Sequence, residues 1–116
     1  MTIEAPTHLV VVTVFPGVDA IDVAGPAEVF AMANLALPPS AARYEVRVLA
    51  AERKAVHTFS GLRIDVDQAF AEVHERPDTI MVTGRVEIGQ YDMPTAIIDA
   101  GVRNWLREHG PDAGRV

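Results

Sequence analysis

The stretch His8-Leu-Val-Val-Val-Thr-Val14 decides the fold of this chain. It is apolar and rich in β-branched residues, and it lacks a strict alternation of polar and apolar positions. This composition is typical of a strand that is buried on both faces, as the strands of parallel sheets are. Phe15-Pro16-Gly17 then ends the strand. The stretch therefore predicts the central strand of a parallel sheet.

A helix and a second strand are expected after this turn. Proline suits the first turn of a helix, where its missing N–H is not needed, so a helix is predicted from Gly25-Pro26 to about Asn34. Three residues at helical spacing form its apolar stripe: Val29, Phe30 and Ala33. Residues 44–49, Tyr-Glu-Val-Arg-Val-Leu, predict a second strand beside the first one, which completes a βαβ unit.

Four further elements are expected downstream. They are a hairpin of residues 55–59 and 62–66 around Ser60-Gly61, a short helical stretch at 68–73, a third parallel strand at 79–83 and an amphipathic helix at 95–109. Within the last helix Asp99 and Arg103 are spaced as an i,i+4 ion pair, and Gly110-Pro111 is expected to end it.

The alternation of strands and helices predicts another strand from Asp112, and residues 112–116 are too few to complete it. We therefore expect an α/β fold, a flavodoxin-like three-layer sandwich with a mostly parallel sheet, incomplete at its C-terminus. The alternative is a complete small domain whose sheet finishes at residues 79–83. In either case residues 1–116 belong to one domain.

Composition excludes several classes of function. The chain has 116 residues, of which 49% are hydrophobic, and a formal net charge of −6, so binding to nucleic acid by this piece is not expected. Its apolar runs are shorter than the roughly 20 residues of a membrane span. The start Met1-Thr2-Ile3-Glu4 does not resemble a secretory signal, so a cytoplasmic location is expected. The chain contains no cysteine, which excludes disulfides, thiolate zinc sites and a cysteine nucleophile within it.

The candidate polar residues give no cofactor or metal motif. The four histidines lack the spacings that metals use, and residues 84–89 lack the glycine pattern of a dinucleotide-binding loop, so neither a metal nor a cofactor is expected. Asp19 and Asp22 precede the first predicted helix, where capping of its N–H groups is favoured over acid/base chemistry. Glu28 falls in the first turn of that predicted helix, where the helix dipole alone explains a glutamate.

A longer motif changes the interpretation of Glu28. The string Ile21-Asp-Val-Ala-Gly-Pro-Ala-Glu-Val-Phe30 resembles the ThiJ/PfpI superfamily of class I glutamine amidotransferase-like domains. Three other segments support the resemblance: Ser60-Gly-Leu-Arg63, Met81-Val-Thr-Gly84, and the helix with Trp105-Leu-Arg107 that leads to Gly114-Arg-Val116. Within the superfamily these details look most like the N-terminal sensor domain of AraC/XylS-type transcriptional regulators, and next like isocyanide hydratases.

The resemblance implies a ligand-binding site at Glu28, Gly84 and Asp22. In such domains a glutamate matching Glu28 approaches a cysteine on a strand-to-helix elbow, and backbone N–H groups near Gly84 bind an oxyanion. The elbow is expected beyond Val116, so no catalytic residue is assigned to this chain. Thr83-Gly84-Arg85 replaces the Pro-Gly-Gly step of many relatives. Arg85 is then expected either to meet a ligand anion or to be solvated, and solvation is favoured.

Three functions follow from these observations. The first is the non-catalytic, small-molecule-sensing part of an AraC-type regulator whose DNA-binding helix-turn-helix lies in a separate module. The second is a truncated isocyanide hydratase-like or related hydrolase or lyase, in which Glu28 supports a cysteine thiolate. The third is a scaffold that forms homodimers by pairing of exposed sheet edges. None of the three includes a membrane partner.

Overall fold

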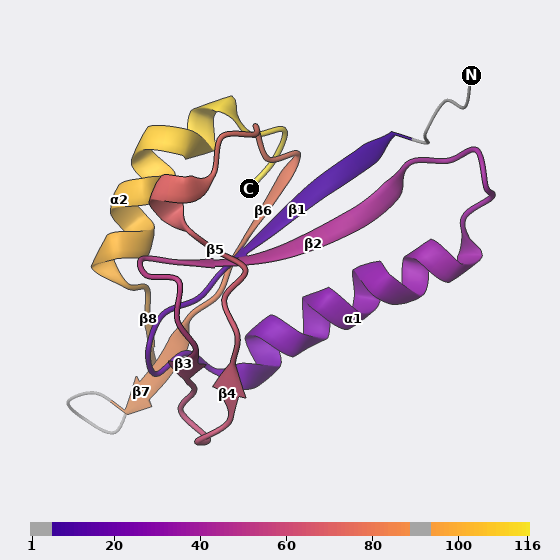
Figure 1. Cartoon of the computed structure of the whole chain (residues 1–116). Helices are drawn as coiled ribbons and strands as arrows, with labels where there is room; N and C mark the ends of the chain where they lie inside the picture. The colour runs from indigo at the N-terminus through magenta and orange to yellow at the C-terminus, as the bar shows by residue number, and fades with distance from the viewer. Residues whose placement is uncertain (1–5, 89–93) are drawn as a thin grey trace.

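β1 (Thr7–Thr13) lies in the middle of a four-stranded parallel sheet with the order β5–β2–β1–β6 (Figure 1). This computed structural model describes residues 6–88 and 94–116. β2 (Arg43–Ala50) pairs with β1 on one side and β6 (Thr79–Val82) pairs with it on the other. β5 (Gln68–Ala69) extends the sheet beyond β2. The prediction of a central parallel strand is confirmed.

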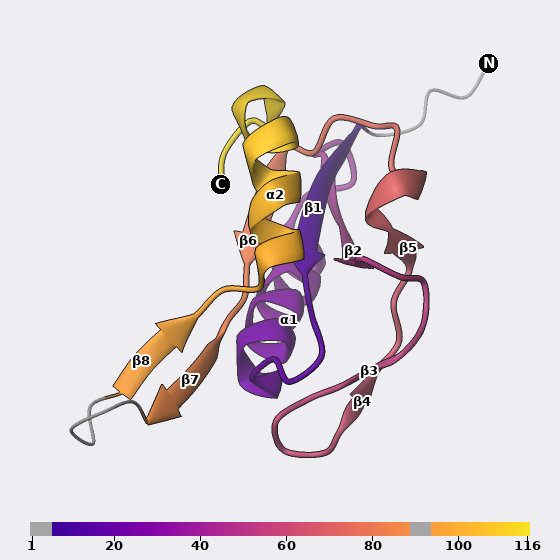
Figure 2. The same cartoon turned by 90° about the vertical axis from the view of Figure 1, so that its left-hand side faces the viewer.

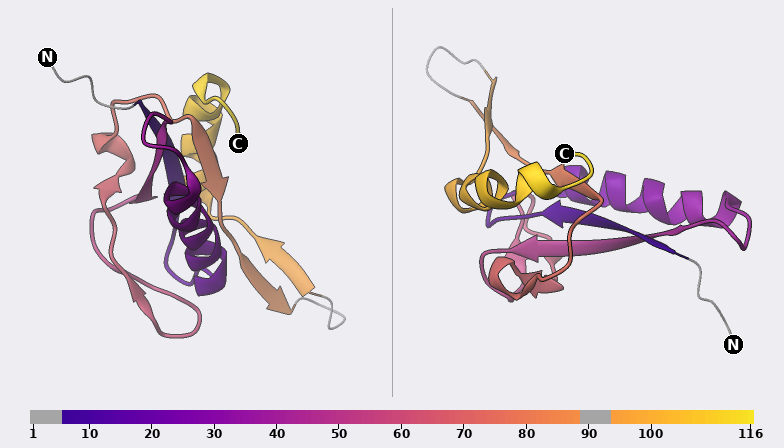
Figure 3. Two further views of the ribbon diagram at one scale, coloured as in Figure 1. Left: turned by 90° about the vertical axis from the view of Figure 1, so that its right-hand side faces the viewer. Right: turned by 90° about the horizontal axis from the view of Figure 1, so that it is seen from above.

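One helix covers each face of this sheet, so the molecule has three layers (Figures 2 and 3). Successive side chains of a strand point to opposite faces. Val10 and Val12 accordingly lie in a core cluster with Phe30 of α1 (Ala20–Ala36). Val11 lies in a second cluster with Trp105 of α2 (Ala100–His109). This α/β architecture is the flavodoxin-like sandwich that the sequence predicts.

Two hairpins extend beyond the carboxyl ends of the sheet strands. The first consists of β3 (Val56–His57) and β4 (Arg63–Ile64), as predicted, with much shorter strands. Its turn is a three-residue loop: Thr58 N–H donates to Leu62 O at 2.8 Å, and Gly61 has a φ of 91°. The second hairpin, β7 (Arg85–Ile88) and β8 (Pro94–Ile97), was not predicted. Its connection, residues 89–93, lies outside the described residues.

α1 begins earlier than the sequence predicted. It starts at Ala20, so Pro26 lies inside the helix and not in its first turn. Besides removing one helical hydrogen bond, a proline inside a helix clashes with the Cβ of the residue before it, and that residue here is Gly25, which has none. Gly25 therefore relieves part of the disruption that Pro26 would otherwise cause.

The apolar stripe predicted for this helix is also only partly correct. Phe30 packs on the core, and Val23 is the buried residue of the helix, but Val29 is 66% exposed. The outward face of α1 is itself apolar, with the large exposed side chains of Ile21, Val29, Met32 and Leu35. This predicted stripe failed because apolar residues occur all around α1, so spacing alone does not identify the buried side.

The second predicted helix also has a different start. α2 begins at Ala100, and residues 94–97 form β8 instead of its first turn. Asp99 does not form the expected ion pair with Arg103; it is the N-cap, and its carboxylate accepts from Gly101 N–H at 2.9 Å and Val102 N–H at 3.2 Å. Capping satisfies helix N–H groups that have no other partner, which favours this role over a solvated ion pair.

The remaining differences are local. The helical stretch expected at 68–73 is β5 followed by a single 3-10 turn, Phe70–Glu72. Gly110 follows α2 as expected, and Gly110–Asp112 forms a second 3-10 turn. Arg115 then lies beside Thr79 as a parallel bridge, with Ile80 N–H donating to Arg115 O at 2.9 Å.

Within the described residues, neither α1 nor α2 has the length and apolarity that crossing a bilayer requires.

Candidate functional site

The strand order defines where this fold offers a ligand site. From β1 the chain goes first to β2 on one side, and β6 is later added on the opposite side of β1. The order thus reverses between β1 and β6. In open α/β sheets ligands bind beyond the carboxyl ends of the strands at such a switch point. Residues 15–19 follow β1 and residues 83–86 follow β6, and we call these two segments the switch-point loops.

Asp19 holds the two switch-point loops together. Its backbone N–H donates to Gly84 O at 3.0 Å, and its carboxylate accepts from Val86 N–H at 3.1 Å. Asp19 occupies the N-cap position of α1, but its side chain makes no capping bond. The expectation that Asp19 caps the helix is therefore wrong, because its carboxylate is used across the loops instead. The start of α1 and the segment after β6 are tied into one unit.

Gly17 allows the loops to approach closely. Its φ of 92° is unfavourable for residues with a Cβ, and a Cβ at this position would lie 3.0 Å from Nη1 of Arg85. Gly17 N–H also donates to His57 O at 2.8 Å, which fixes the loop against the first hairpin. The guanidinium of Arg85 therefore lies directly against the backbone of Gly17. The sequence signal for this role is the Pro16-Gly17 step after the strand, which by itself indicates only the end of that strand.

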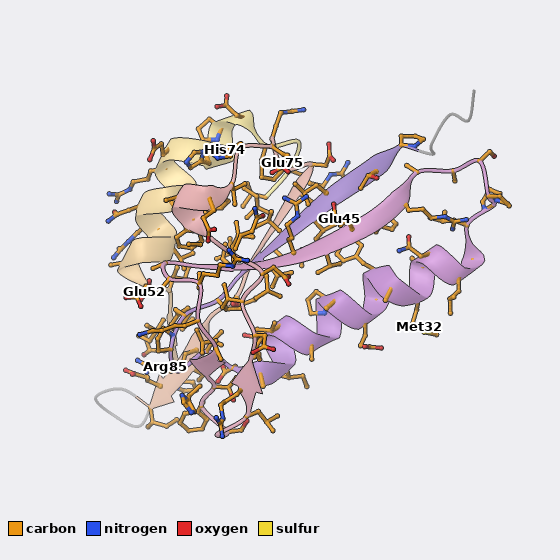
Figure 4. All side chains as sticks on the ribbon, viewed as in Figure 1. Met32, Glu45, Glu52, His74, Glu75 and Arg85 are labelled. Carbon is orange, nitrogen blue, oxygen red and sulfur yellow. The ribbon has the colours of Figure 1, made fainter. Side chains whose placement is uncertain are left out.

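Arg85 is less solvated than the sequence indicated. Its side chain is 31% exposed, and its Nη2 donates to the carboxylate of Glu87 on the same strand. Its Nε is buried and has no hydrogen-bond partner in the described part of the chain. Figure 4 labels Arg85 at the end of the molecule where β7, both strands of the first hairpin and the start of α1 come together. The favoured expectation of a solvated Arg85 is thus corrected.

Glu28 lies farther along α1 than the sequence suggested. It falls in the third turn of the helix, not the first, so the helix dipole does not account for it. It is exposed, and no other residue in the described segments forms a hydrogen bond or ion pair with its carboxylate. Around it the outward face of α1 carries Ile21, Met32 and Leu35. Of the two charged residues of α1, Asp22 and Glu28, it is Glu28 that lies among these three side chains.

Of the three predicted site residues, only Gly84 lies in the switch-point loops. Asp22 is exposed in the first turn of α1, and its backbone N–H donates to Asp19 O at 3.1 Å. Asp22 and Glu28 lie on different sides of α1, since residues six positions apart are separated by more than 90° around a helix. The structure thus links Gly84 to the start of α1 through Asp19, but it does not gather Asp22, Glu28 and Gly84 into one cluster.

An apolar hollow borders the switch-point loops. It has a volume of about 310 Å³ and lies between the start of α1 and the tip of the first hairpin. The hollow is lined by Asp19, Ala20, Ile21, Phe59 and Ser60. A smaller hollow of about 140 Å³ lies near Pro16 and the end of β2. The carboxyl edge of the sheet therefore offers open, mainly apolar space for a small molecule.

An ion-pair network lies away from this edge, on β2. Arg47 donates to Glu75 at 3.0 Å and to Glu45 at 3.1 Å. Burial alone would lower the pKa of Arg47, but the bonds it donates to Glu75 and Glu45 raise that pKa above its ordinary value. The pKa of Glu75 is lowered, by hydrogen bonding from its own backbone N–H and then by Arg47. These charges stabilise each other and belong to the fold.

The described residues do not suggest a metal centre. Among residues 6–88 and 94–116, no group of three or more His, Cys, Asp or Glu side chains lies close enough together to hold an ion. The side-chain donors at the switch-point loops are the guanidinium of Arg85 and the hydroxyl of Thr83, and the hydroxyl already donates to Thr13 O. Such donors suit an anionic or hydrogen-bond-accepting ligand better than a cation.

Comparisons with known proteins support the fold. No family model matches the chain. A protein from Streptomyces lividans described as an "uncharacterized protein in cpoL 5'region" is 37% identical over 82 residues, which cover 69% of this chain and 53% of that protein. The crystal structure of a ThiJ/PfpI family protein from Pseudomonas syringae aligns with 96% of this chain and 41% of its own, at a TM-score of 0.69 and 16% identity. The chain thus spans about half the length of its curated relative.

Proposed function

We propose that this chain is the N-terminal part of a small-molecule-sensing, amidotransferase-like domain of the ThiJ/PfpI superfamily, in an AraC-type transcriptional regulator. The observation that carries the proposal is the placement of the Asp22-to-Phe30 motif. The helix that bears this motif starts at the topological switch point, and Asp19 ties its start to Gly84. The same fold occurs in a ThiJ/PfpI family protein. A metabolite at this edge would contact α1 and the loop after β6 together.

The sensing role is proposed to be non-catalytic. The chain has no cysteine to act as a nucleophile. Thr83 and Arg85 flank Gly84 where many relatives of this superfamily carry Pro-Gly-Gly, and the Arg85 side chain lies over Gly17. A guanidinium at this position favours binding of a ligand anion over stabilisation of a transient oxyanion by backbone N–H groups.

Other parts of the proposal concern partners and location. DNA recognition is assigned to a separate helix-turn-helix module, since this chain is acidic, with a net charge of −6. A cytoplasmic location accords with that role. Homodimer formation is supported by the apolar outward face of α1, because exposed apolar patches often mark protein interfaces.

An enzyme of the isocyanide hydratase type, or a related hydrolase or lyase, is the second candidate. The observation that favours it is Glu28, an exposed carboxylate among apolar side chains of α1 that has no partner among the described residues. A thiolate supplied by another segment would give that carboxylate a catalytic role.

The coding sequence beyond the codon for Val116 distinguishes the two candidates. An apolar strand, a cysteine or its replacement at the elbow, and later a basic helix-turn-helix segment are the result expected for the regulator. A cysteine on a strand-to-helix elbow, followed only by closing helices, would replace the sensor proposal with the enzyme.

The proposed contribution of Glu28 to metabolite binding is tested on the chain itself. A metabolite library is screened by thermal shift against the unaltered chain, Glu28→Ala and Glu108→Ala. Glu108 is the matched control because it is an exposed glutamate on the other helix. Stabilisation by a metabolite that is lost in Glu28→Ala and kept in Glu108→Ala is expected. Equal stabilisation of both variants would show that Glu28 is an ordinary surface residue that does not contribute to metabolite binding.

A further inference from the structure

The guanidinium of Arg85 presents two different edges. Its Nη1 and Cδ face Gly17, at 3.0 and 3.7 Å from where a Cβ would stand. Because Nη1 and Cδ lie on the same side of a guanidinium, its Nε and Nη2 form the opposite edge. That second edge is the one that carboxylates and phosphates bind side-on, with two parallel N–H···O bonds.

Only half of this second edge is used. Nη2 donates to Glu87, whereas Nε is buried and has no acceptor among the described residues. Buried donors are almost always paired, with protein, water or a ligand, so this Nε has the capacity to donate to a bound group. Glu87 is a weak occupant of the edge, since its side chain is 48% exposed and solvent-exposed ion pairs contribute little.

Hydrogen bonds to the residues before and after Arg85 fix the position of its backbone. Asp19 N–H holds the carbonyl of the preceding Gly84, and the carboxylate of Asp19 holds the N–H of the following Val86. The side chain rests on Gly17, which has no Cβ to displace it. A guanidinium held in this way loses little freedom when it binds a ligand, which favours affinity.

We propose that the Nε–Nη2 edge of Arg85 binds the oxoanion of the ligand, a carboxylate or a phosphoryl group, and that Glu87 occupies this edge until the ligand displaces it. The proposal rests on the proposed small-molecule site and deepens it, since it names the chemical class of the ligand. Two bonds from the ligand replace the single bond from Glu87 and satisfy the buried Nε. The carboxylate of Asp19 accepts from Val86 N–H and, among the described residues, forms no ion pair with Arg85.

The test is a titration of the 116-residue chain with sodium acetate and, separately, inorganic phosphate, at constant ionic strength balanced with chloride. Amide chemical shifts of Gly17, Gly84 and Val86 report binding. Saturable shifts are expected with at least one of the two anions, and the anion that binds more tightly assigns the ligand as a carboxylate or a phosphate. Arg85→Gln should weaken binding at least about tenfold, and Arg85→Lys, which keeps the charge without the planar fork, by several-fold.

Glu87→Gln separates this proposal from a purely structural role of the ion pair. Removing the competing carboxylate should tighten anion binding by about two- to fivefold. If Arg85 and Glu87 only hold the hairpin, Glu87→Gln will leave anion affinity unchanged or weaken it. Three results would overturn the proposal. They are an anion affinity that Glu87→Gln leaves unchanged or weakens, chemical-shift changes that persist in Arg85→Gln, and the absence of saturable shifts in both the unaltered chain and Glu87→Gln. A metabolite that binds at Glu28 without an Arg85 dependence would overturn the proposal and leave the sensing function standing.

Discussion

The N–H of Asp19 and the carbonyl of Gly84 meet at 3.0 Å, and this bond joins the segment after the first strand of the sheet to the segment after the last. Both residues lie just beyond strands that pair with each other, β1 and β6. The contact therefore depends on the strand order and not on sequence proximity. Substitutions in these loops are therefore expected to affect the fold and the candidate site together.

Gly17→Ala should destabilise the chain by about 1–3 kcal/mol, because a residue with a Cβ is strained at the observed φ of 92° and would press on Arg85. Urea unfolding followed by circular dichroism measures the loss. Gly110→Ala is the control, since Gly110 has a helical φ of −57° and its added Cβ would meet only Val116, at 3.9 Å. Equal effects of the two substitutions would contradict the strained role of Gly17.

Asp99→Ala should lower the free energy of unfolding by about 1 kcal/mol, because two N–H groups of α2 lose their acceptor. Asp99→Asn keeps an acceptor oxygen and should recover most of this loss. Arg103→Ala should change stability by less than about 0.5 kcal/mol, since the structure gives Asp99 a capping role. The same unfolding assay measures all three variants. A large effect of Arg103→Ala on the free energy of unfolding would support the ion pair that the sequence predicts.

Glu75→Gln should reduce the dependence of stability on acid pH. The pKa of Glu75 is lowered in the folded chain, so its contribution is fully present above the ordinary glutamate pKa of about 4.3 and is lost as the pH falls through the lower folded value. Unfolding midpoints from neutral pH down to about pH 3 should therefore fall less steeply in this variant. Arg47→Gln should have a smaller effect in the same direction, since it removes the ion-pair partner but leaves the backbone N–H that lowers the pKa of Glu75 most. Unchanged pH profiles in both variants would show that the pair contributes nothing.

Met32→Lys and Leu35→Lys should each weaken self-association about tenfold or more, because these exposed side chains, 61% and 80% accessible, would be buried in a dimer formed through α1. Sedimentation over a concentration series measures the association constant. Ile98→Lys is the control, since Ile98 is also exposed but lies outside α1. A chain that stays monomeric at all concentrations, or that responds equally to Ile98→Lys, would exclude this face as the interface.

The sheet could be predicted from the sequence because its strands carry strong local signals. Val10, Val11 and Val12 are fully buried, as an uninterrupted β-branched run implies. The helix starts could not be predicted so well. Pro26 favours a first turn, but it lies inside α1, where Gly25 before it removes one of the clashes that a proline makes in a helix. The spacing of Asp99 and Arg103 predicts an ion pair, but spacing cannot show that α2 begins at Ala100, which makes Asp99 its N-cap.

The candidate site was predictable only in part. Gly84 was found because it ends a recognisable strand, but its partner Asp19 lies 65 positions earlier in the printed sequence, and no local pattern connects the two. Arg85 was expected to be solvated, since a single arginine after a glycine carries no sign of burial. Its half-buried position depends on Gly17 and on a hairpin, β7 and β8, that the helical pattern of residues 95–109 concealed.

The central place of β1 has a consequence for synthesis of the chain. β1 is made first, yet Val10 pairs with Val46 and with Thr79, which leave the ribosome much later. At roughly 5–20 residues per second, the most apolar strand remains without its second neighbour for several seconds. Chaperones that bind nascent apolar segments therefore have time to recognise residues 8–14. Slowly translated codons between those for Val46 and Thr79 should prolong this exposure and lower the yield of folded chain.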